Sequence, residues 1–502
     1  MAVFDDYALW QIAVIAGYFL TLVLLSVYGT HRYLIVRLFK AHDQGDPEPE
    51  GRFEEADLPA VTVQLPVFNE RYVVERLIDA ACALDYPRDR LHIQVLDDST
   101  DDTTERARRR VQHWRRQGLD IELLHRDNRQ GYKAGALAEG LRQARGDFVA
   151  IFDADFIPRP GFLKETIHHF VDDAIGMVQA RWSYINRDYS LMTRAQAVLL
   201  DGHFILEHTA RHRSGRFFNF NGTAGIWRRQ TIDDAGGWEH DTLTEDLDLS
   251  YRAQLKGWSF RYLKDLEVPS ELPVTMTAFK SQQHRWSKGA LQTAIKMLPR
   301  VFRSDQPLKV KIEAFYHLTG NLAYVLMVIL ALLMPLATLI RIQQGWYEVL
   351  LLDLPIFFGA TVSICYFYWT SQRAQGRRAL QTLTLLPTVL ALGIGLCLNN
   401  AKGVVGAAIG HDSPFVRTPK YAIDRLDTSW ATKLYKRKAS IMPALELAFG
   451  TWFSYAIWIV LTDPGQPLAS LPFLLLFQIG FLYVALVTIA QALSLGDAPS
   501  SA

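Results

Sequence analysis

The sequence predicts an α/β domain inserted between one N-terminal transmembrane helix and a C-terminal region of transmembrane helices. Apolar segments long enough to cross a bilayer lie near both ends of the 502-residue chain. From Pro59 onward, short apolar runs alternate with amphipathic stretches, which is typical of a parallel, doubly wound sheet. Acidic clusters directly follow two of the predicted strands. Because ligands bind at the carboxyl ends of strands in such sheets, these clusters indicate a site.

The first apolar run covers residues 8–28 and is preceded by Asp5 and Asp6 rather than by basic residues. The positive-inside rule places its C-terminal end in the cytoplasm, because basic residues follow it there. We therefore expect residues 1–40 to hold a retained transmembrane helix and not a cleaved signal peptide. Residues 41–58 are rich in Asp, Glu, Pro and Gly and are expected to be a linker. The basic residues are His31, Arg32, Arg37 and Lys40.

The soluble block is predicted to cover residues 59–300. Its hydrophobic pattern predicts strands at 61–65, 92–96, 121–124 and 148–152. Helices are predicted at 70–84, 101–117 and 134–144, the first with Asn69 as its N-cap. The chain has no Gly-rich dinucleotide fingerprint, so a standard NAD-binding domain is not expected.

Residues 301–410 are predicted to contain an interfacial helix at 303–312 followed by transmembrane helices. Apolar runs of spanning length cover 317–340, 349–370 and 380–409, and two more cover 444–461 and 470–491 within the C-terminal region 441–502. The loops 371–378 and 411–440 are both basic, so both should be cytoplasmic. That requires 380–409 to cross twice or to re-enter without crossing. We expect five to seven crossings, with the soluble block inside the cell.

Composition narrows the possible partners. The net charge is only +1, which gives no electrostatic argument for a nucleic-acid partner, and none is expected. The three cysteines form neither a disulfide framework nor a CxxC metal pattern.

The first candidate site is Asp153-Ala154-Asp155, which follows the predicted strand 148–152. Such carboxylates can hold Mg²⁺ or Mn²⁺, and the cation can neutralise the charge on a departing nucleoside diphosphate. Alone the motif is weak, because a strand-end turn with aspartate caps gives the same pattern.

The second is Asp97-Asp98, at the end of the strand 92–96. These carboxylates could accept hydrogen bonds from a base or ribose, or could simply cap the next helix. Lys133 lies at a predicted helix start, where an ammonium and the helix N-terminus together favour a diphosphate. An ordinary solvated lysine is the alternative.

Transfer of a group to a hydroxyl needs a general base. Asp246 in Thr244-Glu245-Asp246-Leu247-Asp248 is the candidate, and Glu245 and Asp248 are competitors. Asn221-Gly222-Thr223 could line the acceptor side or form a simple turn.

In Gln282-Gln283-His284-Arg285-Trp286, Arg285 could hold a diphosphate bidentately. Trp286 could stack on the apolar face of a sugar.

Together these motifs resemble the signature series of family 2 membrane glycosyltransferases, which include cellulose, hyaluronan and chitin synthases. The resemblance is closer to the cellulose-synthase-like mannan, glucomannan and glucan synthases, on the stretches Val178-Gln179-Ala180-Arg181-Trp182, Phe220-Asn221-Gly222-Thr223-Ala224-Gly225, Asp234-Ala235-Gly236-Gly237-Trp238, Ser270-Glu271-Leu272-Pro273 and Gln282–Ser287. Phe415-Val416-Arg417-Thr418-Pro419-Lys420 resembles their gating loop, which covers the bound donor. The similarity covers most of residues 59–425. Lys288 departs from the pattern, which usually has a smaller residue there, and large insertions are absent.

The resemblance implies a nucleotide-sugar-binding domain of the GT-A type. It also implies roles for individual residues. Asp98 would contact the nucleotide base, Asp153 the diphosphate and Asp155 the metal, with Asp246 as the general base. Gln282, Arg285 and Trp286 would hold the diphosphate and the acceptor terminus, and Lys420 the donor. The remaining donor-side candidates are Asp97 and Lys133, and the remaining acceptor-side candidates are Asn221, Gly222 and Thr223.

The expected activity is that of an inverting, processive synthase. It would polymerise a β-linked hexose chain, β-1,4-mannan, glucomannan or β-glucan, from GDP-mannose or UDP-glucose and pass the growing glycan across the membrane. Such a protein is multi-pass, contacts membrane lipids and would lie in the plasma membrane of a prokaryote. The alternative is a non-processive lipid glycosyltransferase of the ceramide glucosyltransferase type. A transporter or scaffold is disfavoured because the predicted spans carry almost no charged residues.

Overall fold

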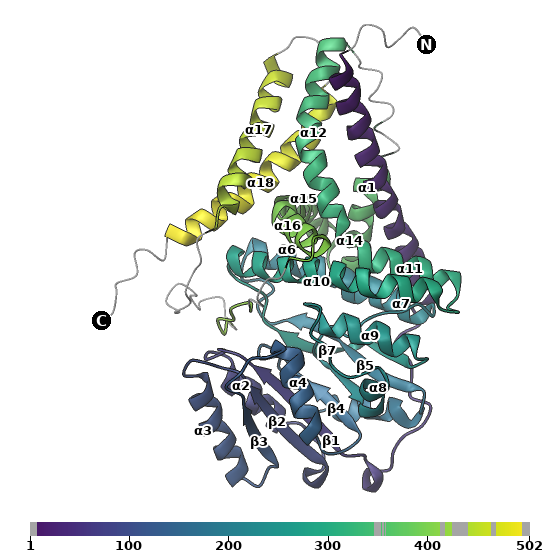
Figure 1. Ribbon diagram of the computed structural model, residues 1–502, viewed down its shortest axis with the longest axis vertical. Coiled ribbons are helices and arrows are strands. Elements are labelled where there is room, and N and C mark those ends of the chain that lie inside the picture. Colours follow the sequence, from purple (N-terminus) through teal and green to yellow (C-terminus); the bar gives the residue numbers. More distant parts are fainter. Residues whose placement is uncertain are drawn as a thin grey trace.

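The computed structural model describes residues 8–345, 353, 356, 358–411, 417–423, 440–462 and 468–493. A block of sheet and helices forms one end of the molecule, and long helices form the other end (Figure 1). The N-terminal helix α1 (Leu9–His42) belongs to the helical end. The block begins with strand β1 (Val61–Val67), at the position where the sequence predicts the first strand.

The block is built on a seven-stranded sheet with the order β3-β2-β1-β4-β6-β5-β7. Strands β1 to β4 run parallel, and β5 and β7 also pair in parallel. The predicted strands at 92–96, 121–124 and 148–152 are confirmed to within a residue. The strands after β1 are β2 (Leu91–Asp97), β3 (Ile121–His125), β4 (Phe148–Ile151), β5 (Ile175–Tyr184), β6 (Gly225–Arg228) and β7 (Ser259–Ser270).

The prediction of a wholly parallel sheet is wrong, because β6 runs antiparallel to both β4 and β5. The chain enters β6 at the edge of the sheet where β4 ends, so β6 must run back along β4. Ile151 pairs with Gly225, and the Ala224 N–H donates to the Ile151 carbonyl at 2.8 Å. This reversal places the residues before β6 beside those after β4.

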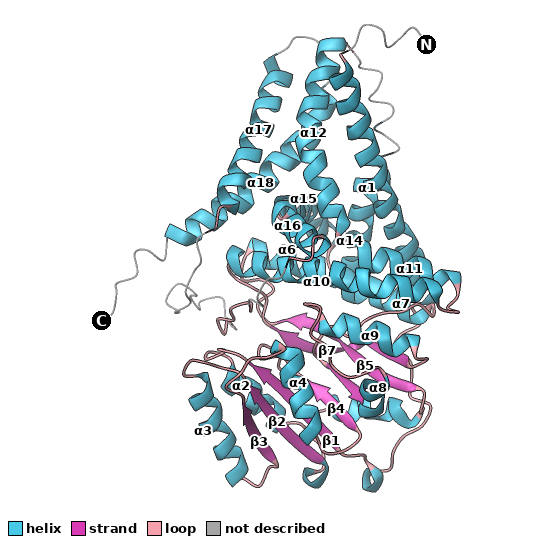
Figure 2. Ribbon diagram, in the orientation of Figure 1, coloured by secondary structure: helices cyan, strands magenta, loops and turns pink. Residues whose placement is uncertain are grey.

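Helices cover both faces of the sheet (Figure 2). Alternate residues of the strands point to opposite faces, so β4 gives Ala150 to one core and Ile151 to the other. One core contains residues of α2 and α3, and the other contains residues of α4, α8 and α9. The helices of the block are α2 (Val74–Cys82), α3 (Thr103–Arg116), α4 (Tyr132–Gln143), α5 (Phe162–Thr166), α8 (Arg229–Asp234) and α9 (Glu245–Leu255), with short 3-10 helices η1 (Glu55–Asp57), η2 (Arg88–Arg90) and η3 (Ile167–Val171).

The predicted helix 70–84 begins later than expected, at Val74, and Asn69 is not its N-cap. Asn69 has a left-handed backbone with φ of 55°. Its side-chain oxygen accepts from the Thr100 N–H at 2.7 Å, so it ties together the loops that follow β1 and β2. The two other predicted helices are confirmed within two residues, as α3 and α4.

Two helical segments connect the block to the end of the molecule that the long helices form. The first is continuous from Leu191 to Arg213 and contains a π-helix in its middle. It consists of α6 (Leu191–Asp201), the π-helix η4 (Gly202–His208) and α7 (Thr209–Arg213). The second is the 28-residue helix α10 (Met276–Arg303), followed by α11 (Leu308–Thr319). Both lie between the sheet and the long helices (Figure 1). The predicted interfacial stretch 303–312 therefore spans the end of α10 and the start of α11.

Four described helices are long and apolar enough to cross a membrane: α1, α12 (Leu322–Gln344), α17 (Met442–Thr462) and α18 (Leu471–Leu493). Helices α15 (Ala379–Gly395) and α16 (Cys397–Ala408) form a pair bent by 42°, which has the geometry of either a broken span or a re-entrant loop. Of the two predictions for 380–409, re-entry without crossing is compatible with this bend. Counting that pair as one span gives five among the described residues, the low end of the predicted range. The predicted span 349–370 lies partly outside the described residues. Its described part contains the π-helix η6 (Phe358–Val362) and the start of α14 (Ser363–Ala374). The short 3-10 helix η7 (Leu468–Ser470) precedes α18.

A buried ion pair joins α10 to the last two long helices. Lys280 Nζ of α10 donates to Glu446 Oε2 of α17 at 2.8 Å and to Thr488 Oγ1 of α18 at 2.9 Å. Glu446 is fully buried. Because an unpaired charge is costly in a buried setting, this contact fixes the position of α10 relative to the two helices.

Gly146→Ala tests the turn that leads into β4. Gly146 has φ of +85°, and an added Cβ would lie 2.3 Å from the Ala60 carbonyl oxygen, a backbone atom that cannot rotate away. Gly118 has almost the same φ, +84°, but an added Cβ would meet its nearest neighbour only at 3.7 Å. Gly118→Ala is therefore the matched control for backbone strain alone. We expect Gly146→Ala to destabilise the protein by about 1–3 kcal/mol more than Gly118→Ala in thermal unfolding. Equal losses would contradict the steric argument.

Candidate functional site

A cavity of about 180 Å³ lies at the carboxyl ends of the central strands, and α10 lines one side of it. Twelve of the fifteen candidate site residues that the sequence singles out line this cavity. Asp97, Thr223 and Asp248 do not. The twelve are Asp98, Lys133, Asp153, Asp155, Asn221, Gly222, Glu245, Asp246, Gln282, Arg285, Trp286 and Lys420.

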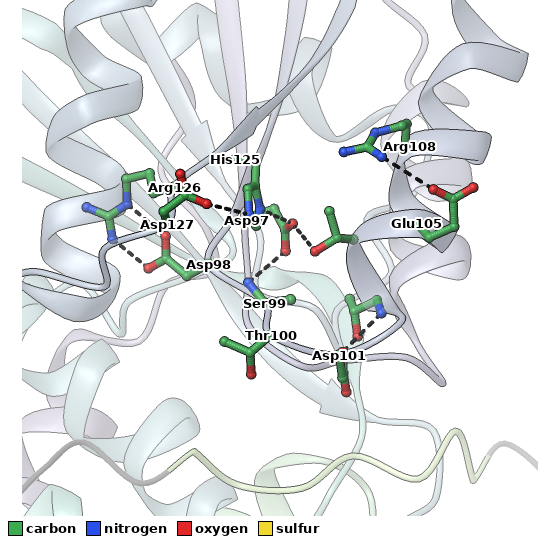
Figure 3. Close-up of polar contacts among 12 residues, drawn as sticks. Asp97, Asp98, Ser99, Thr100, Asp101, Glu105, Arg108, His125, Arg126 and Asp127 are labelled. Atoms are coloured by element: carbon green, nitrogen blue, oxygen red, sulfur yellow. Dashed lines mark hydrogen bonds and ion pairs between the residues drawn. The ribbon is translucent and has the colours of Figure 1, made fainter.

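The adjacent carboxylates of Asp97 and Asp98 diverge (Figure 3). Asp97 is fully buried and accepts from the Ser99 N–H at 3.0 Å, from Thr104 Oγ1 at 2.6 Å and from His125 Nδ1 at 2.7 Å. Asp97, a candidate for the donor site, does not line the cavity; its oxygens instead hold the loop after β2. Asp98 lines the cavity and accepts from two nitrogens of the Arg126 guanidinium, Nε at 2.7 Å and Nη2 at 2.5 Å.

The carboxylates of Asp153 and Asp155 are each paired with a lysine. Lys133 Nζ donates to Asp153 and to the Gly222 carbonyl at 2.9 Å. Lys420 Nζ donates to Asp155 Oδ2 at 2.7 Å and to the Glu271 carbonyl at 2.9 Å. Burial alone would lower the pKa of Lys133, but the carboxylates of Asp153 and Glu245 hold it above its ordinary value. Two carboxylates on one side of a polar cavity form an oxygen-donor set that suits Mg²⁺ or Mn²⁺.

A different carboxylate cluster lies outside the cavity. Glu239, Asp241 and Asp248 have ligand atoms close enough to share an ion. The Lys296 ammonium already contacts all three, at 2.5, 2.8 and 3.0 Å. Asp248 also accepts from Arg252 Nε at 2.8 Å. These contacts remove Asp248 from the competitors for the general base, because its carboxylate serves ion pairs away from the cavity.

The turn Asn221–Thr223 touches both acidic groups of the cavity. The Asp153 N–H donates to Thr223 Oγ1 at 2.8 Å. Thr223 therefore joins the turn to the end of β4 and does not line the cavity. Gly222 has φ of +80°, and an added Cβ would lie 3.0 Å from Asp246 Oδ2. A side chain at this position would therefore be strained and would crowd Asp246.

Glu245 and Asp246 lie in the first turn of α9 and line the cavity, where Glu245 is buried and Asp246 is half-buried. Burial raises the pKa of Asp246, and the Glu245 carboxylate raises it further, to about 7, although Lys133 opposes the shift. Burial also raises the pKa of Glu245. The pair thus contains a carboxyl that can exchange a proton near neutral pH.

Helix α10 presents two different faces. Gln282, Arg285 and Trp286 are spaced i, i+3 and i+4, so they share the face that lines the cavity. His284 and Lys288 lie on the opposite side, where His284 Nδ1 is 3.1 Å from the Asn399 carbonyl of α16 and Lys288 donates to the His411 carbonyl. The unusual Lys288 is thus a buried contact to the region after α16 and not a cavity residue.

Residues 417–423 pass over the opening of the cavity. Arg417 pairs with Glu70 at 2.9 Å, and the Tyr421 N–H donates to Glu271 Oε1 at 2.8 Å. Burial raises the pKa of Glu70 to about 8. Glu70 and Glu271 also line the cavity, although the sequence analysis does not identify them as site residues. Glu271 could have been identified, because it directly follows a strand in Ser270-Glu271-Leu272-Pro273. Phe415 and Val416 of the predicted gating loop lie outside the described residues.

Comparison with known proteins adds to this geometry. Residues 59–289 match the family model described as glycosyltransferase like family 2. These residues form a family 2 glycosyltransferase domain.

The predicted resemblance to glucomannan synthases is also confirmed. The chain is 46% identical over 280 residues to glucomannan 4-beta-mannosyltransferase 1 of Oryza sativa subsp. japonica, an alignment that covers 55% of this chain and 53% of that protein. It is 45% identical over 310 residues to glucomannan 4-beta-mannosyltransferase 2 of Arabidopsis thaliana, covering 59% and 58%. The chain thus spans somewhat more than half the length of these relatives.

The fold also has a solved counterpart. The mannosyltransferase PcManGT from Pyrobaculum calidifontis, solved with GDP-Man and Mn²⁺, superposes with a TM-score of 0.51 at 20% sequence identity, covering 80% of this chain and 99% of that one. The mixed sheet is accordingly a GT-A fold, with helices at the N-terminus and in the C-terminal region that are long and apolar enough to span a membrane.

The titration of Asp246 can be tested directly. Because the Glu245 carboxylate raises the pKa of Asp246, Glu245→Gln should lower it, and deprotonation of Asp246 should then occur at a lower pH than in the unsubstituted protein. Infrared difference spectroscopy across pH, with Asp246→Asn as the reference, follows the protonated carboxyl. Glu239→Gln, which removes a carboxylate outside the cavity, is the control. An unchanged or higher midpoint in Glu245→Gln would contradict the assignment.

Proposed function

We propose that this chain is an inverting hexosyltransferase that builds a β-linked polysaccharide of the mannan or glucomannan type from a nucleotide sugar. The observation that carries the proposal is the convergence of Asp153, Asp155, Asp246, Arg285 and Trp286 on one cavity beside the membrane-like helices. The names of the relatives favour a mannosyl donor, and the solved counterpart holds GDP-Man, so we propose GDP-mannose as the donor with UDP-glucose as the second choice.

The donor's diphosphate would lie between the carboxylates after β4 and the cations that face them. Asp153 and Asp155 would hold Mg²⁺ or Mn²⁺, which supplies positive charge to the leaving diphosphate. Lys133 and Arg285 add positive charge from the start of α4 and from α10. Lys420 would move from Asp155 to the donor once Asp155 is engaged, which would make the closure of residues 417–423 respond to the donor. Asp98, oriented by Arg126, would contact the base.

Asp246 would act as the general base. The acceptor hydroxyl oxygen attacks the anomeric carbon as the bond from that carbon to the diphosphate oxygen breaks, and the hydroxyl proton passes to the Asp246 carboxylate. A pKa raised to about 7 suits this role, because the group is ionised at working pH and still basic enough to take the proton. A single displacement of this kind inverts the anomeric configuration.

The acceptor would lie against Trp286, whose ring can stack on the apolar face of a sugar. Because α10 contacts the bent pair α15–α16 on its other face, an elongating glycan would leave the cavity towards the long helices. With basic loops on the side of the soluble block, this block would lie in the cytoplasm and the product would cross the bilayer. Lipids would surround α1, α12, α17 and α18.

Incubation of the purified full chain with labelled GDP-mannose or UDP-glucose and Mg²⁺ or Mn²⁺ tests the reaction. We expect polymer from GDP-mannose that a β-1,4-mannanase digests, and a loss of about 10²–10⁴-fold in rate for Asp246→Asn because the base is removed. Short lipid-soluble products would instead favour the ceramide glucosyltransferase type of activity. Full activity of Asp246→Asn would rule out the base assignment.

Trp286→Ala separates acceptor binding from donor binding. Removing the ring should slow chain elongation several-fold more than it slows hydrolysis of the donor, because water needs no stacking surface. Trp286→Phe, which keeps an aromatic face, should recover most of the elongation rate. Equal losses of elongation and hydrolysis in Trp286→Ala would argue against a stacking role.

A further inference from the structure

A continuous line of polar contacts runs from the N-terminal helix α1 to the cavity. Arg32 of α1 pairs with Glu207 Oε1 in the π-helix η4. Glu207 Oε2 lies 2.8 Å from His203 Nδ1, and His203 Nε2 lies 2.9 Å from Asn221 Nδ2. Asn221 lines the cavity. Thus three contacts connect a candidate membrane helix to the acceptor side of the site.

The π-helix explains why two histidines reach the same amide. His203 and His208 are five residues apart, and in an α-helix with 3.6 residues per turn such residues lie on different faces. The wider i→i+5 turn of a π-helix brings them together, and their ring centroids are 4.3 Å apart. His208 Nε2 therefore contacts Asn221 Oδ1 while His203 contacts Asn221 Nδ2. Single π-turns within helices often occur at functional sites.

The contacts fix one direction for every hydrogen bond in this line. The Glu207 carboxylate can only accept, so His203 Nδ1–H donates to it and His203 Nε2 accepts from the Asn221 amide. The Asn221 oxygen then accepts from His208 Nε2–H. This leaves His208 Nδ1 as a buried acceptor without a partner among the described residues. Burial lowers the pKa of His203 well below its ordinary value and that of His208 to about 3, so both rings are neutral, as this pattern requires.

A parallel set of contacts ties the same helices together one turn away. Arg211 of α7 lies 3.4 Å from Glu207 Oε2 and donates from Nε to Glu313 Oε1 at 2.9 Å. Glu313 of α11 is also 3.0 Å from His31 of α1. Consequently Glu207 keeps a cationic partner if Arg32 is replaced. Helix α1 is joined to the π-helix directly by Arg32 and to α7 by His31 through Glu313.

From these contacts we propose that His203 and Glu207 are positioning residues for the acceptor side of the site, and that α1, through Arg32, is a structural part of that site. They act through Asn221, whose neighbours in the same turn hold the Gly222 carbonyl against Lys133 and Thr223 Oγ1 against the Asp153 N–H. The Asn221 side-chain nitrogen carries two hydrogens. One is donated to His203 Nε2, and this bond fixes the direction of the second, which is left to donate to an acceptor sugar. The inference rests on the proposed transferase function only for the identity of the acceptor, a sugar hydroxyl.

Hydrogen exchange tests the coupling without any activity measurement. Replacement of Arg32 by Met in the purified full chain should increase amide exchange in the segment 217–224, because Glu207 Oε1 loses its ion pair with α1 and the Glu207 carboxylate, then held by Arg211 alone, orients His203 less firmly. Arg37→Met is the matched control, since Arg37 lies on the same helix and is exposed. The same comparison between His203→Phe and His212→Phe uses two half-buried histidines that lie nine residues apart in the helical segment from Leu191 to Arg213. Of these two, only His203 contacts Asn221. Exchange that is equal within each pair would overturn the proposal.

Kinetics supply the second readout. His203→Phe should raise the KM for a soluble glycan acceptor roughly three- to tenfold, as expected for the loss of one hydrogen bond, while donor hydrolysis stays within about twofold. Glu207→Gln keeps an oxygen that can accept from His203 and should recover part of the loss relative to Glu207→Leu. If hydrolysis and transfer fall together, or if His203→Phe behaves like His212→Phe, the positioning role is wrong. If the unsubstituted protein transfers no hexose from either donor, the proposed function fails, and the exchange measurement alone decides the coupling.

Discussion

The compensation of buried negative charge is the constraint on which the arrangement of this protein depends. Asp153, Asp155, Glu245 and Asp246 share one cavity, and carboxylates brought together away from water are costly unless cations meet them. The cations come from three separate parts of the chain: Lys133 begins α4, Arg285 lies in α10, and Lys420 lies beyond the bent pair α15–α16. Each of these segments is therefore held at the cavity by charge as well as by packing. If a donor and a metal ion bind, the metal would take the place of the lysines beside the carboxylates, and the diphosphate would pair with the released cations. The net charge of the cavity would then change little.

The position of α10 follows from this constraint. One face of the helix supplies Arg285 and its neighbours to the cavity, and the opposite face is occupied by α16, where an added Cβ on Gly403 would lie 2.8 Å from the His284 carbonyl oxygen. The two helices thus approach closely only because Gly403 has no side chain. Because α10 is packed on both faces, it has little freedom to rotate about its axis. The positions of Gln282, Arg285 and Trp286 on the helix therefore determine the shape of the cavity.

The sequence predicts the parts of this structure that depend on local patterns. Alternating apolar residues locate β1 to β4, and the aspartates after β2 and β4 fall at the edge where parallel strands end. The pattern cannot tell Asp97 from Asp98, because adjacent side chains point in opposite directions and the choice depends on His125 and Arg126, which belong to another strand and its loop. It likewise cannot show the reversed β6, whose pairing depends on where the chain returns. The roles of His203 and Glu207 depend on a π-turn, for which the sequence carries no signal.

The ion pair between Lys280 and Glu446 has a mechanical consequence. Lys280 lies two residues before Gln282, and its partners belong to the two long helices that end the described chain. Helices of this kind tilt when the hydrocarbon layer around them becomes thicker or thinner, at a cost of fractions of a kcal/mol per Å. A tilt of α17 and α18 would pull on Lys280 and hence on the cavity face of α10. If these helices span a membrane, its thickness would thereby affect the shape of the cavity through a single ion pair.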